Sequence, residues 1–506
     1  MGAALNTQNL RRMHEEFVVD GITVLSPDML PDVDDDTLYD RAAQIYTDLA
    51  AAPSKTAHLD TLGDRALVQA VPELQVLLNA PALVAALETL VGPDYLIHPH
   101  CFLHEATGRD QVFHQDGNLP WNERGHYRSH RPDWALLFYY PQAVTLANGP
   151  TEIAPGTQYW TKDFEREDGR YHPGDAFDRA FFKEVMDSDD IELRDTRNAQ
   201  ALASLGVPDL ERRFVTVPKG SVAICHYDIV HRGSRQAPEQ PGRYMYKFYF
   251  ARTRIPASRG WAKPAAVRRE LKPVVDEIWR WTDGVQPDTV AVRAADCRRD
   301  LEDGREDEKV AAAYNLAQLA RQGEAEARSA LGTALTAPTE STRRAAAYGV
   351  RALGPEAKVA LPALEHTRVG VRRMAAFALG TEALGDDADV LEALLGVLCT
   401  DEDDLARSNA AYALGQIARS TTAQHVRLFT ALLARLAVGV EPNNTEVALL
   451  PRSTVRQSVA YALLQAACNH GIPEACRADV EALRADDDRY VAGFVEEVLT
   501  RAGEAD

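Results

Sequence analysis

The sequence predicts an α+β protein in two parts, a strand-rich N-terminal half framed by helices and an all-α array of repeats. Between residues 95 and 250, short segments alternate apolar and polar residues as half-buried strands do, and glycine- and proline-rich turns separate them. Beyond Phe250 the strands stop, and residues 264–281 are expected to form a helix despite Pro273. From residue 301 onward, alanine-rich blocks recur at intervals typical of helical repeats. With 506 residues, 45% of them hydrophobic, the chain is long enough for two or three domains.

Helices lead into the strand-rich half. The periodicity of apolar residues predicts helices over residues 7–20 and 35–52, a short strand over 22–25, and a helical stretch over 72–91. Residues 96–104 then alternate as a strand, whose evenly spaced histidines share one face and are expected to line a barrel wall near the site. These histidines are His98, His100 and His104.

Residues 112–117 carry the first candidate metal ligands. In a strand, side chains two residues apart share a face, so His114 and Asp116 would present an imidazole and a carboxylate to one ion. Two histidines and one carboxylate on one face of a metal leave the opposite positions open, as in non-haem Fe(II) oxygenases. Because a lone strand histidine is more often a structural residue than a ligand, this interpretation depends on a third ligand.

Two later segments offer that ligand and a cationic partner. Residues 218–234 are predicted as a turn, a strand and a second turn, with His226 and His231 as alternative ligands. Residues 242–250 are a further alternating strand that begins near Arg243. The planar guanidinium of arginine offers a fork of donors that matches a carboxylate.

Taken in order, these motifs resemble the phytanoyl-CoA dioxygenase family of Fe(II)- and 2-oxoglutarate-dependent oxygenases, over about half of the chain. Residues 17–25 are similar to the family's first strand, and His114 and Asp116 match its first two ligands. Residues 148–158 resemble its Asn-Gly-Pro segment, with Gln158 where histidine is usual.

The resemblance implies a double-stranded β-helix of the jelly-roll or cupin-like kind, with His231 rather than His226 as the distal ligand. The three ligands would hold Fe(II) and form the catalytic centre, 2-oxoglutarate would chelate the iron with its far carboxylate on Arg243, and dioxygen would bind last. Ser234, one residue beyond the family's usual serine, is expected to contact the co-substrate. Related halogenases replace the ligating carboxylate by a small residue, so Asp116 implies hydroxylation or another oxidation of a C–H bond.

Cationic residues follow the metal motif, in residues 121–132, and residues 134–140 are a buried strand. Some of these cations, with one histidine of the earlier strand, are expected to receive an anionic substrate group, and a solvated loop is an equal alternative. These residues are Arg124, Arg128, Arg131 and His104. The long segment 159–213 is expected to act as a lid.

The C-terminal two-fifths repeats itself. A basic residue followed five places later by an aromatic recurs at separations of 34, 29, 35 and 49 residues, beginning at Lys309, Arg343, Arg372, Arg407 and Arg456. Such a period predicts an α-solenoid and resembles HEAT-like repeats, with Arg343, Arg372 and Arg407 in the inter-repeat arginine position. The solenoid is expected to bind a protein, a carrier domain or a second copy of the chain, and a purely stabilising module is the alternative.

The expected domains are an oxygenase domain over residues 1–285, a linker over 286–300 and the HEAT-like solenoid over 301–506. The net charge is −20 and neither half has a basic excess, so nucleic acid is not an expected partner. No apolar run reaches the length of a membrane span, and six scattered cysteines indicate neither a disulfide framework nor a zinc site. A cytoplasmic location is therefore expected.

Two other classes of protein compete with the oxygenase interpretation. One is a non-catalytic scaffold in which the barrel is degenerate and the repeats carry the function. The other is a metal-dependent hydrolase or isomerase on a cupin-like barrel, which would have no use for Arg243. The substrate, whether a small molecule or a group tethered to a carrier or protein, does not follow from the fold.

Overall fold

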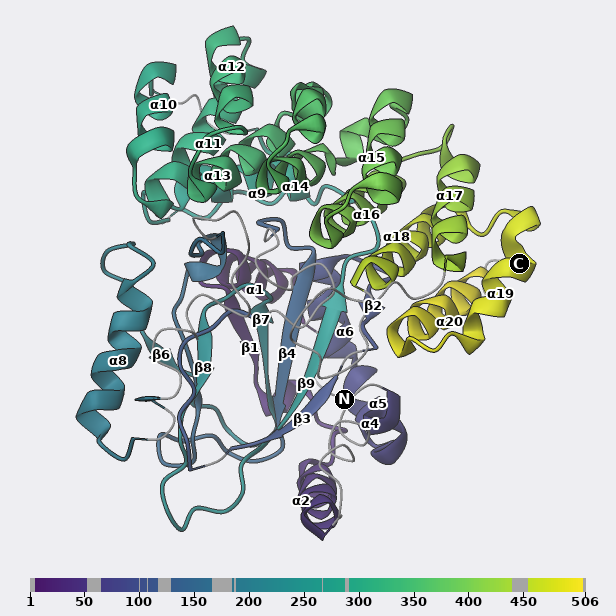
Figure 1. Cartoon of the computed structure of the whole chain (residues 1–506). Helices are drawn as coiled ribbons and strands as arrows, with labels where there is room; N and C mark the ends of the chain where they lie inside the picture. Colours follow the sequence, from purple (N-terminus) through teal and green to yellow (C-terminus); the bar gives the residue numbers. More distant parts are fainter. Residues whose placement is uncertain are drawn as a thin grey trace.

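The computed structural model describes residues 5–51, 65–99, 101–106, 108–116, 129–165, 184–185, 188–265, 267–286, 291–438 and 454–503. A domain built on β-sheets lies under a curved row of helices that runs from the green α10 to the yellow α20 (Figure 1). The chain order follows this arrangement, with the sheets first and the row of helices second.

Helices frame the sheets. They are α1 (Thr7–Val19), α2 (Asp35–Ala51), α4 (Arg65–Ala70), α5 (Leu74–Leu78), α6 (Pro81–Val91) and α8 (Ile191–Ala203), with 3-10 turns η1 (Pro27–Met29) and η3 (Thr157–Tyr159). The helical stretch predicted over 72–91 is two helices, α5 and α6. Pro81 has no N–H to continue α5, but its fixed φ suits the first turn of a new helix.

In the described part of the chain the strands form two antiparallel sheets, which make up the predicted double-stranded β-helix. The larger, six-stranded sheet has the order β1-β7-β4-β9-β2, with β3 also paired to β9, and the smaller has the order β6-β5-β8. The strands are β1 (Ile22–Leu25), β2 (Leu96–Ile97), β3 (Phe102–Glu105), β4 (Trp134–Tyr140), β5 (Thr151–Ile153), β6 (Arg213–Phe214), β7 (Ser221–His226), β8 (His231–Gly233) and β9 (Tyr244–Ala251). Every residue of β4, β7 and β9 is buried, so the site lies on a rigid core.

The strand predicted around His114 is not formed. His114 instead makes an isolated antiparallel bridge with His231, the first residue of β8. The ladder stops there because the next side chain, Gln115, turns inward and donates to the backbone carbonyls of Trp160 and Asp228.

The C-terminal half is an array of paired helices. They are α9 (Lys272–Asp283), α10 (Ala294–Asp303), α11 (Glu306–Arg321), α12 (Ala325–Ala334), α13 (Glu340–Ala352), α14 (Val369–Leu379), α15 (Ala388–Thr400), α16 (Asp404–Ala418), α17 (His425–Ala437), α18 (Thr454–His470), α19 (Arg477–Ala482) and α20 (Arg489–Gly503), with 3-10 segments η4 (Gly354–Glu365), η5 (Glu382–Leu384), η6 (Glu474–Cys476) and η7 (Leu483–Ala485). The predicted basic-aromatic blocks lie on α11, α13, α14, α16 and α18, which pack on one another in that order as an inner row.

Two expectations about the junction between the halves change. The helix predicted over 264–281 begins only at Lys272, because Pro273 is accommodated in the first turn of a helix and not in its interior. Part of the expected linker, residues 286–300, is helical, since α10 begins at Ala294. The domain boundaries themselves stay a prediction.

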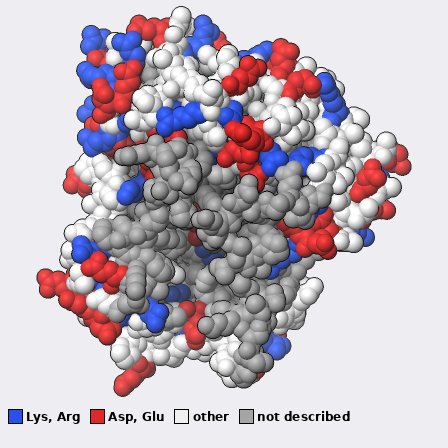
Figure 2. All heavy atoms as spheres, in the orientation of Figure 1, with Lys and Arg blue, Asp and Glu red and all other residues white. Residues whose placement is uncertain are grey.

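Figure 2 shows Lys and Arg side chains interspersed with Asp and Glu over the repeats on one face of the molecule. The repeats contain ion pairs between such residues, for example Lys358 with Asp387 at 2.8 Å. Within the described ranges, none of the helices combines the length and the apolar character that crossing a lipid bilayer needs.

Candidate metal centre

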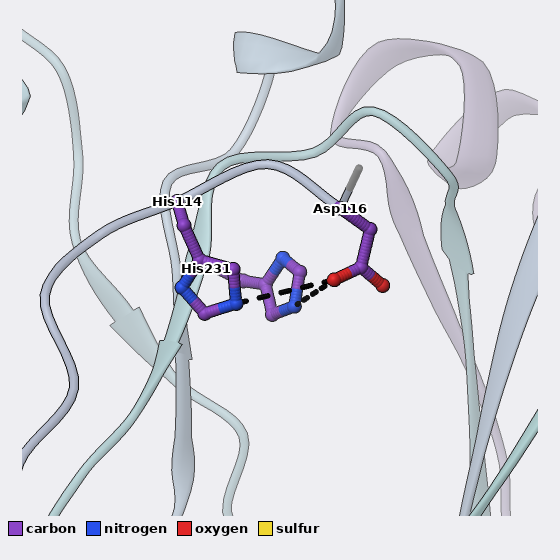
Figure 3. A group of neighbouring side chains, drawn as sticks. All are labelled: His114, Asp116 and His231. Atoms are coloured by element: carbon purple, nitrogen blue, oxygen red, sulfur yellow. Dashed lines mark ion pairs between the residues drawn. The ribbon is translucent and has the colours of Figure 1, made fainter. Parts of the chain in front are cut away.

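Two histidines and one aspartate converge inside the barrel (Figure 3). The backbones of His114 and His231 exchange two N–H···O hydrogen bonds of 2.9 Å, which places their rings 4.5 Å apart. The Oδ1 of Asp116 lies 4.0 Å from Nε2 of His114 and 3.9 Å from Nε2 of His231. All three candidate ligand atoms lie within 4.8 Å of one another, so they face a common point.

Backbone carbonyls orient both rings. The Nδ1 atoms of His114 and His231 lie 3.0 Å from the carbonyls of Val112 and Ile229, respectively. This arrangement favours the tautomer that carries its proton on Nδ1, and it leaves the lone pair of each Nε2 for a metal. Burial, followed by the charge of His114, lowers the pKa of His231 to about 3, so this imidazole is neutral at pH 7.

Lys247 of β9 holds the aspartate. Its Nζ donates to Oδ2 of Asp116 at 2.5 Å, on the side away from the oxygen that faces the imidazoles. Burial by itself would raise the pKa of Asp116, but Lys247 and the two histidines hold it below its ordinary value. None of the sequence motifs singles out Lys247. The available signal was its spacing of four residues from Arg243, which puts both cations on one face of the strand.

Gln115 fixes the backbone between the two ligands of the motif. Its Nε2 donates to the carbonyl of Trp160 at 2.9 Å and to that of Asp228 at 2.7 Å. Asp228 precedes His231 by three residues, so one side chain ties the first ligand segment to the second. Nothing in the sequence pattern distinguished this glutamine.

The ligands open onto a cavity of about 450 Å³. Side chains of both polar and apolar types line it, including Phe102, His104, Glu105, Arg109, Phe138, Ser234, Arg243, Met245 and Lys247. A cavity of this size is in the range of small-molecule sites.

Arg243 is a buried cation with unused donors in this cavity wall. Its Nη2 donates to the carbonyl of Gly149 at 2.6 Å, whereas its Nε and Nη1 have no hydrogen-bond partner within the described part of the chain. Gly149 has a φ of +77°, and a Cβ there would lie 2.7 Å from the carbonyl oxygen of Ser234, so this position requires glycine. Burial lowers the pKa of Arg243, which makes an anionic partner favourable. Ser234 also lines the cavity, and its hydroxyl donates to the carbonyl of Pro150.

The residues expected to contact the substrate lie in different parts of the structure. His104 lines the cavity, and Arg124 and Arg128 lie outside the described residues. Arg131 is not in the cavity wall. It pairs with Glu382 of the repeats at 2.6 Å and packs 4.8 Å from the ring of Trp281. The structure thus places Arg131 against the repeats and not in this cavity wall, and its pairing with an acid stabilises the buried guanidinium there.

Other histidines also lie apart from the metal ligands. His226 packs against the rings of Phe17 and Tyr159, and its Nδ1 accepts the N–H of Asp228. His98, expected on the barrel wall, is buried against Phe494 of the repeats, and His100 lies outside the described residues. In the described part of the chain, the only metal-ligand cluster contains His231 and excludes His226.

Gln158 fills the position where the family usually has a histidine. It is fully buried, and its Nε2 donates to the carbonyl of Val18 at 2.9 Å, which ties η3 to the end of α1. Its role in the structure is therefore to join two elements of the scaffold.

Comparison with protein families decides the assignment. Residues 12–241 match the family model of phytanoyl-CoA dioxygenase (PhyH), and residues 357–437 match that of HEAT repeats. The PhyH match covers somewhat less than half of the chain, and the sheet-containing part, which we call the PhyH domain, is similar to this family. The PhyH match supports a non-haem iron oxygenase, and the resemblance seen in the sequence is confirmed for both parts of the chain.

No curated protein matches the chain. Among solved structures, a complex of the epimerase SnoN with Fe³⁺, alpha ketoglutarate and nogalamycin RO is 13% identical, covers 49% of this chain and 85% of that chain, and has a TM-score of 0.34. EctD from S. alaskensis, solved with 2-oxoglutarate and 5-hydroxyectoine, is 17% identical over 57% of this chain and 88% of that chain, with a TM-score of 0.31. The assignment of the PhyH domain rests on the family match and not on these structures.

Proposed function

We propose that the chain is an Fe(II)- and 2-oxoglutarate-dependent dioxygenase that hydroxylates, or otherwise oxidises, an unactivated C–H bond. One observation carries the proposal: two imidazoles and a carboxylate converge in the cavity whose wall contains a buried arginine with two unused donors. Iron bound by His114, Asp116 and His231 would supply the oxidising chemistry together with 2-oxoglutarate and dioxygen.

The protein's own residues prepare this site. Arg243 would bind the far carboxylate of 2-oxoglutarate with the donors that the fold leaves unused, and Ser234 would contact it at the same wall. Lys247 occupies one oxygen of Asp116, which leaves the other oxygen for the metal. The buried barrel excludes water from the ligand side.

We propose a small molecule, or a group tethered to a carrier or protein, as the substrate. His104, Arg109 and Glu105 give the cavity polar contacts, and Phe102 and Met245 give it an apolar wall. This combination fits a substrate with an aliphatic part and a charged or polar group. The role of segment 159–213 as a lid, and binding of a protein partner or second copy by the repeats, stay predictions.

The geometry does not favour a non-catalytic barrel. In a barrel without activity, a buried arginine with unused donors would only cost folding free energy. Its presence beside three side chains that face a common point therefore favours a ligand-binding site. The arginine likewise counts against a hydrolase or isomerase that binds only the metal.

Anaerobic addition of Fe(II) and 2-oxoglutarate tests the proposal. We expect a weak visible charge-transfer band, and succinate formation when oxygen is admitted. His231→Asn should abolish both, and the matched control His226→Asn should retain both, since His226 lies outside the ligand cluster. Absence of the band and of succinate in the wild-type protein would exclude the dioxygenase.

A further inference from the structure

The recurring aromatic residues of the repeats contact the PhyH domain of the same chain. The ring of His130 stacks on Tyr348 of α13 at 3.7 Å, and its Nδ1 lies 2.8 Å from the hydroxyl of Tyr314 of α11. Trp134, the first residue of β4, packs 5.4 Å from Tyr461 of α18. These tyrosines are three of the five aromatic positions of the repeat signature, so the inner row of the solenoid is a docking surface for its own oxygenase domain.

A second part of the inner row holds the segment 161–165. The Oε2 atom of Glu340, at the start of α13, accepts the backbone N–H groups of Phe164 and Glu165, each at 2.6 Å. The carboxylate of Glu165 is buried and pairs with Arg343 and, at 2.8 Å, with Arg368. A backbone held by charge-assisted hydrogen bonds away from water has little freedom to shift.

This held segment leads to the metal ligands. Its neighbour Trp160 supplies the carbonyl that accepts from Gln115, the residue between His114 and Asp116. The same amide also bonds to Asp228, in the turn that leads to the third ligand. These hydrogen bonds therefore connect the repeats, through the segment that follows Trp160 and through Gln115, to backbone within a few residues of all three metal ligands.

We propose that the HEAT repeats position the metal ligands of the PhyH domain. In this inference, which rests on the proposed function, Glu340 fixes segment 161–165, the fixed carbonyl of Trp160 orients Gln115, and Gln115 holds the ligand segment in its metal-binding geometry. Glu340 and Gln115 are positioning residues that do not touch the metal. Outer partners of metal ligands commonly change metal affinity by about 10- to 100-fold.

The solenoid offers a matched control for Glu340. Asp401 is also a buried carboxylate of the repeats, accepts the N–H of Asp403 at 2.9 Å and pairs with Arg372 at 2.6 Å. None of its hydrogen bonds, among the described residues, reaches the PhyH domain. Asp401→Ala therefore perturbs the repeats without releasing segment 161–165.

The test measures Co(II) affinity by titration of the full-length chain, with thermal unfolding of each variant as the check on folding. We expect Gln115→Met to weaken Co(II) binding about 10- to 100-fold and Glu340→Ala about 10-fold, with Asp401→Ala within about twofold of wild type. The double variant Gln115→Met/Glu340→Ala should bind Co(II) as Gln115→Met does, because both substitutions act through one contact.

Two results would overturn the inference: equal effects of Glu340→Ala and Asp401→Ala, or a double variant whose loss is the product of the two single losses. Should Glu340→Ala fail to fold, Glu340→Met keeps the length of the side chain and removes the acceptor for Phe164 and Glu165, and unchanged Co(II) affinity in that variant overturns the inference as well. If the wild-type chain binds no Co(II), both the inference and the proposed function are overturned. Binding with no response to Glu340 overturns only the positioning role.

Discussion

Replacement of Arg243 tests how the site recognises 2-oxoglutarate. Two buried donors of its guanidinium, Nε and Nη1, have no hydrogen-bond partner among the residues that the structure describes, so these donors have lost hydration without gaining a protein acceptor there. Each hydrogen bond from such a group to a carboxylate contributes about 1.5–3 kcal/mol. Loss of both in Arg243→Ala should cost about 3–6 kcal/mol of binding free energy, which corresponds to roughly 100- to 10,000-fold weaker binding of 2-oxoglutarate.

The assay is an anaerobic titration of the Fe(II)-loaded protein with 2-oxoglutarate, followed by the charge-transfer band. Arg243→Lys should recover only part of the loss, because an ammonium supplies the charge without the planar pair of donors. Metal affinity should stay within about twofold in both variants, since Arg243 bonds to Gly149 and not to a ligand. Wild-type affinity for 2-oxoglutarate in Arg243→Ala would refute the reasoning, and so would a loss that comes entirely from weaker metal binding.

Three further variants probe the metal site, the domain interface and a buried histidine. Lys247→Met removes the largest charge that offsets burial, so the pKa of Asp116 should rise and Co(II) binding should be lost at a higher pH than in wild type or Lys247→Arg. Loss of Co(II) binding at the same pH as in wild type would contradict this. Arg419→Met should cost about 3–5 kcal/mol of unfolding free energy, because Asp133 is fully buried and pairs with Arg419 at 2.8 Å. Adding Asp133→Asn should restore part of that free energy in urea titrations, and no restoration would argue against the pair. Burial lowers the pKa of His98 to about 3, so below pH 6.5 the unfolded chain binds more protons than the folded chain. The free energy of unfolding should therefore fall by about 1.4 kcal/mol per pH unit as the pH is lowered. His98→Phe should lose less of this free energy between pH 7 and pH 5 than wild type, and equal losses would exclude this cause.

Much of this protein follows from short-range patterns in its sequence. An apolar run predicts β4, a stretch between two turns predicts β7, and alternation predicts β9. The resemblance to the family's order of motifs predicts His114, Asp116, His231 and Arg243 as one site. The repeat period predicts the row of helices, since each pair must bury the same face against its neighbour.

Element boundaries depend on finer features of the chain. Pro81 divides a predicted helix into two, and Pro273 delays another, because the position of a proline within a turn decides whether a helix continues or begins. The isolated bridge between His114 and His231 replaces a predicted strand, since Gln115 finds backbone partners in two other segments.

Only the tertiary structure decides which buried charges meet. Arg131 was a candidate for substrate binding by its neighbours in the sequence, yet its partner is Glu382, 251 residues away. Lys247 reaches Asp116 across 131 residues, and Glu340 reaches Phe164 across 176. A buried charge takes its role from the group it pairs with, and that group is brought to it by the packing of distant elements.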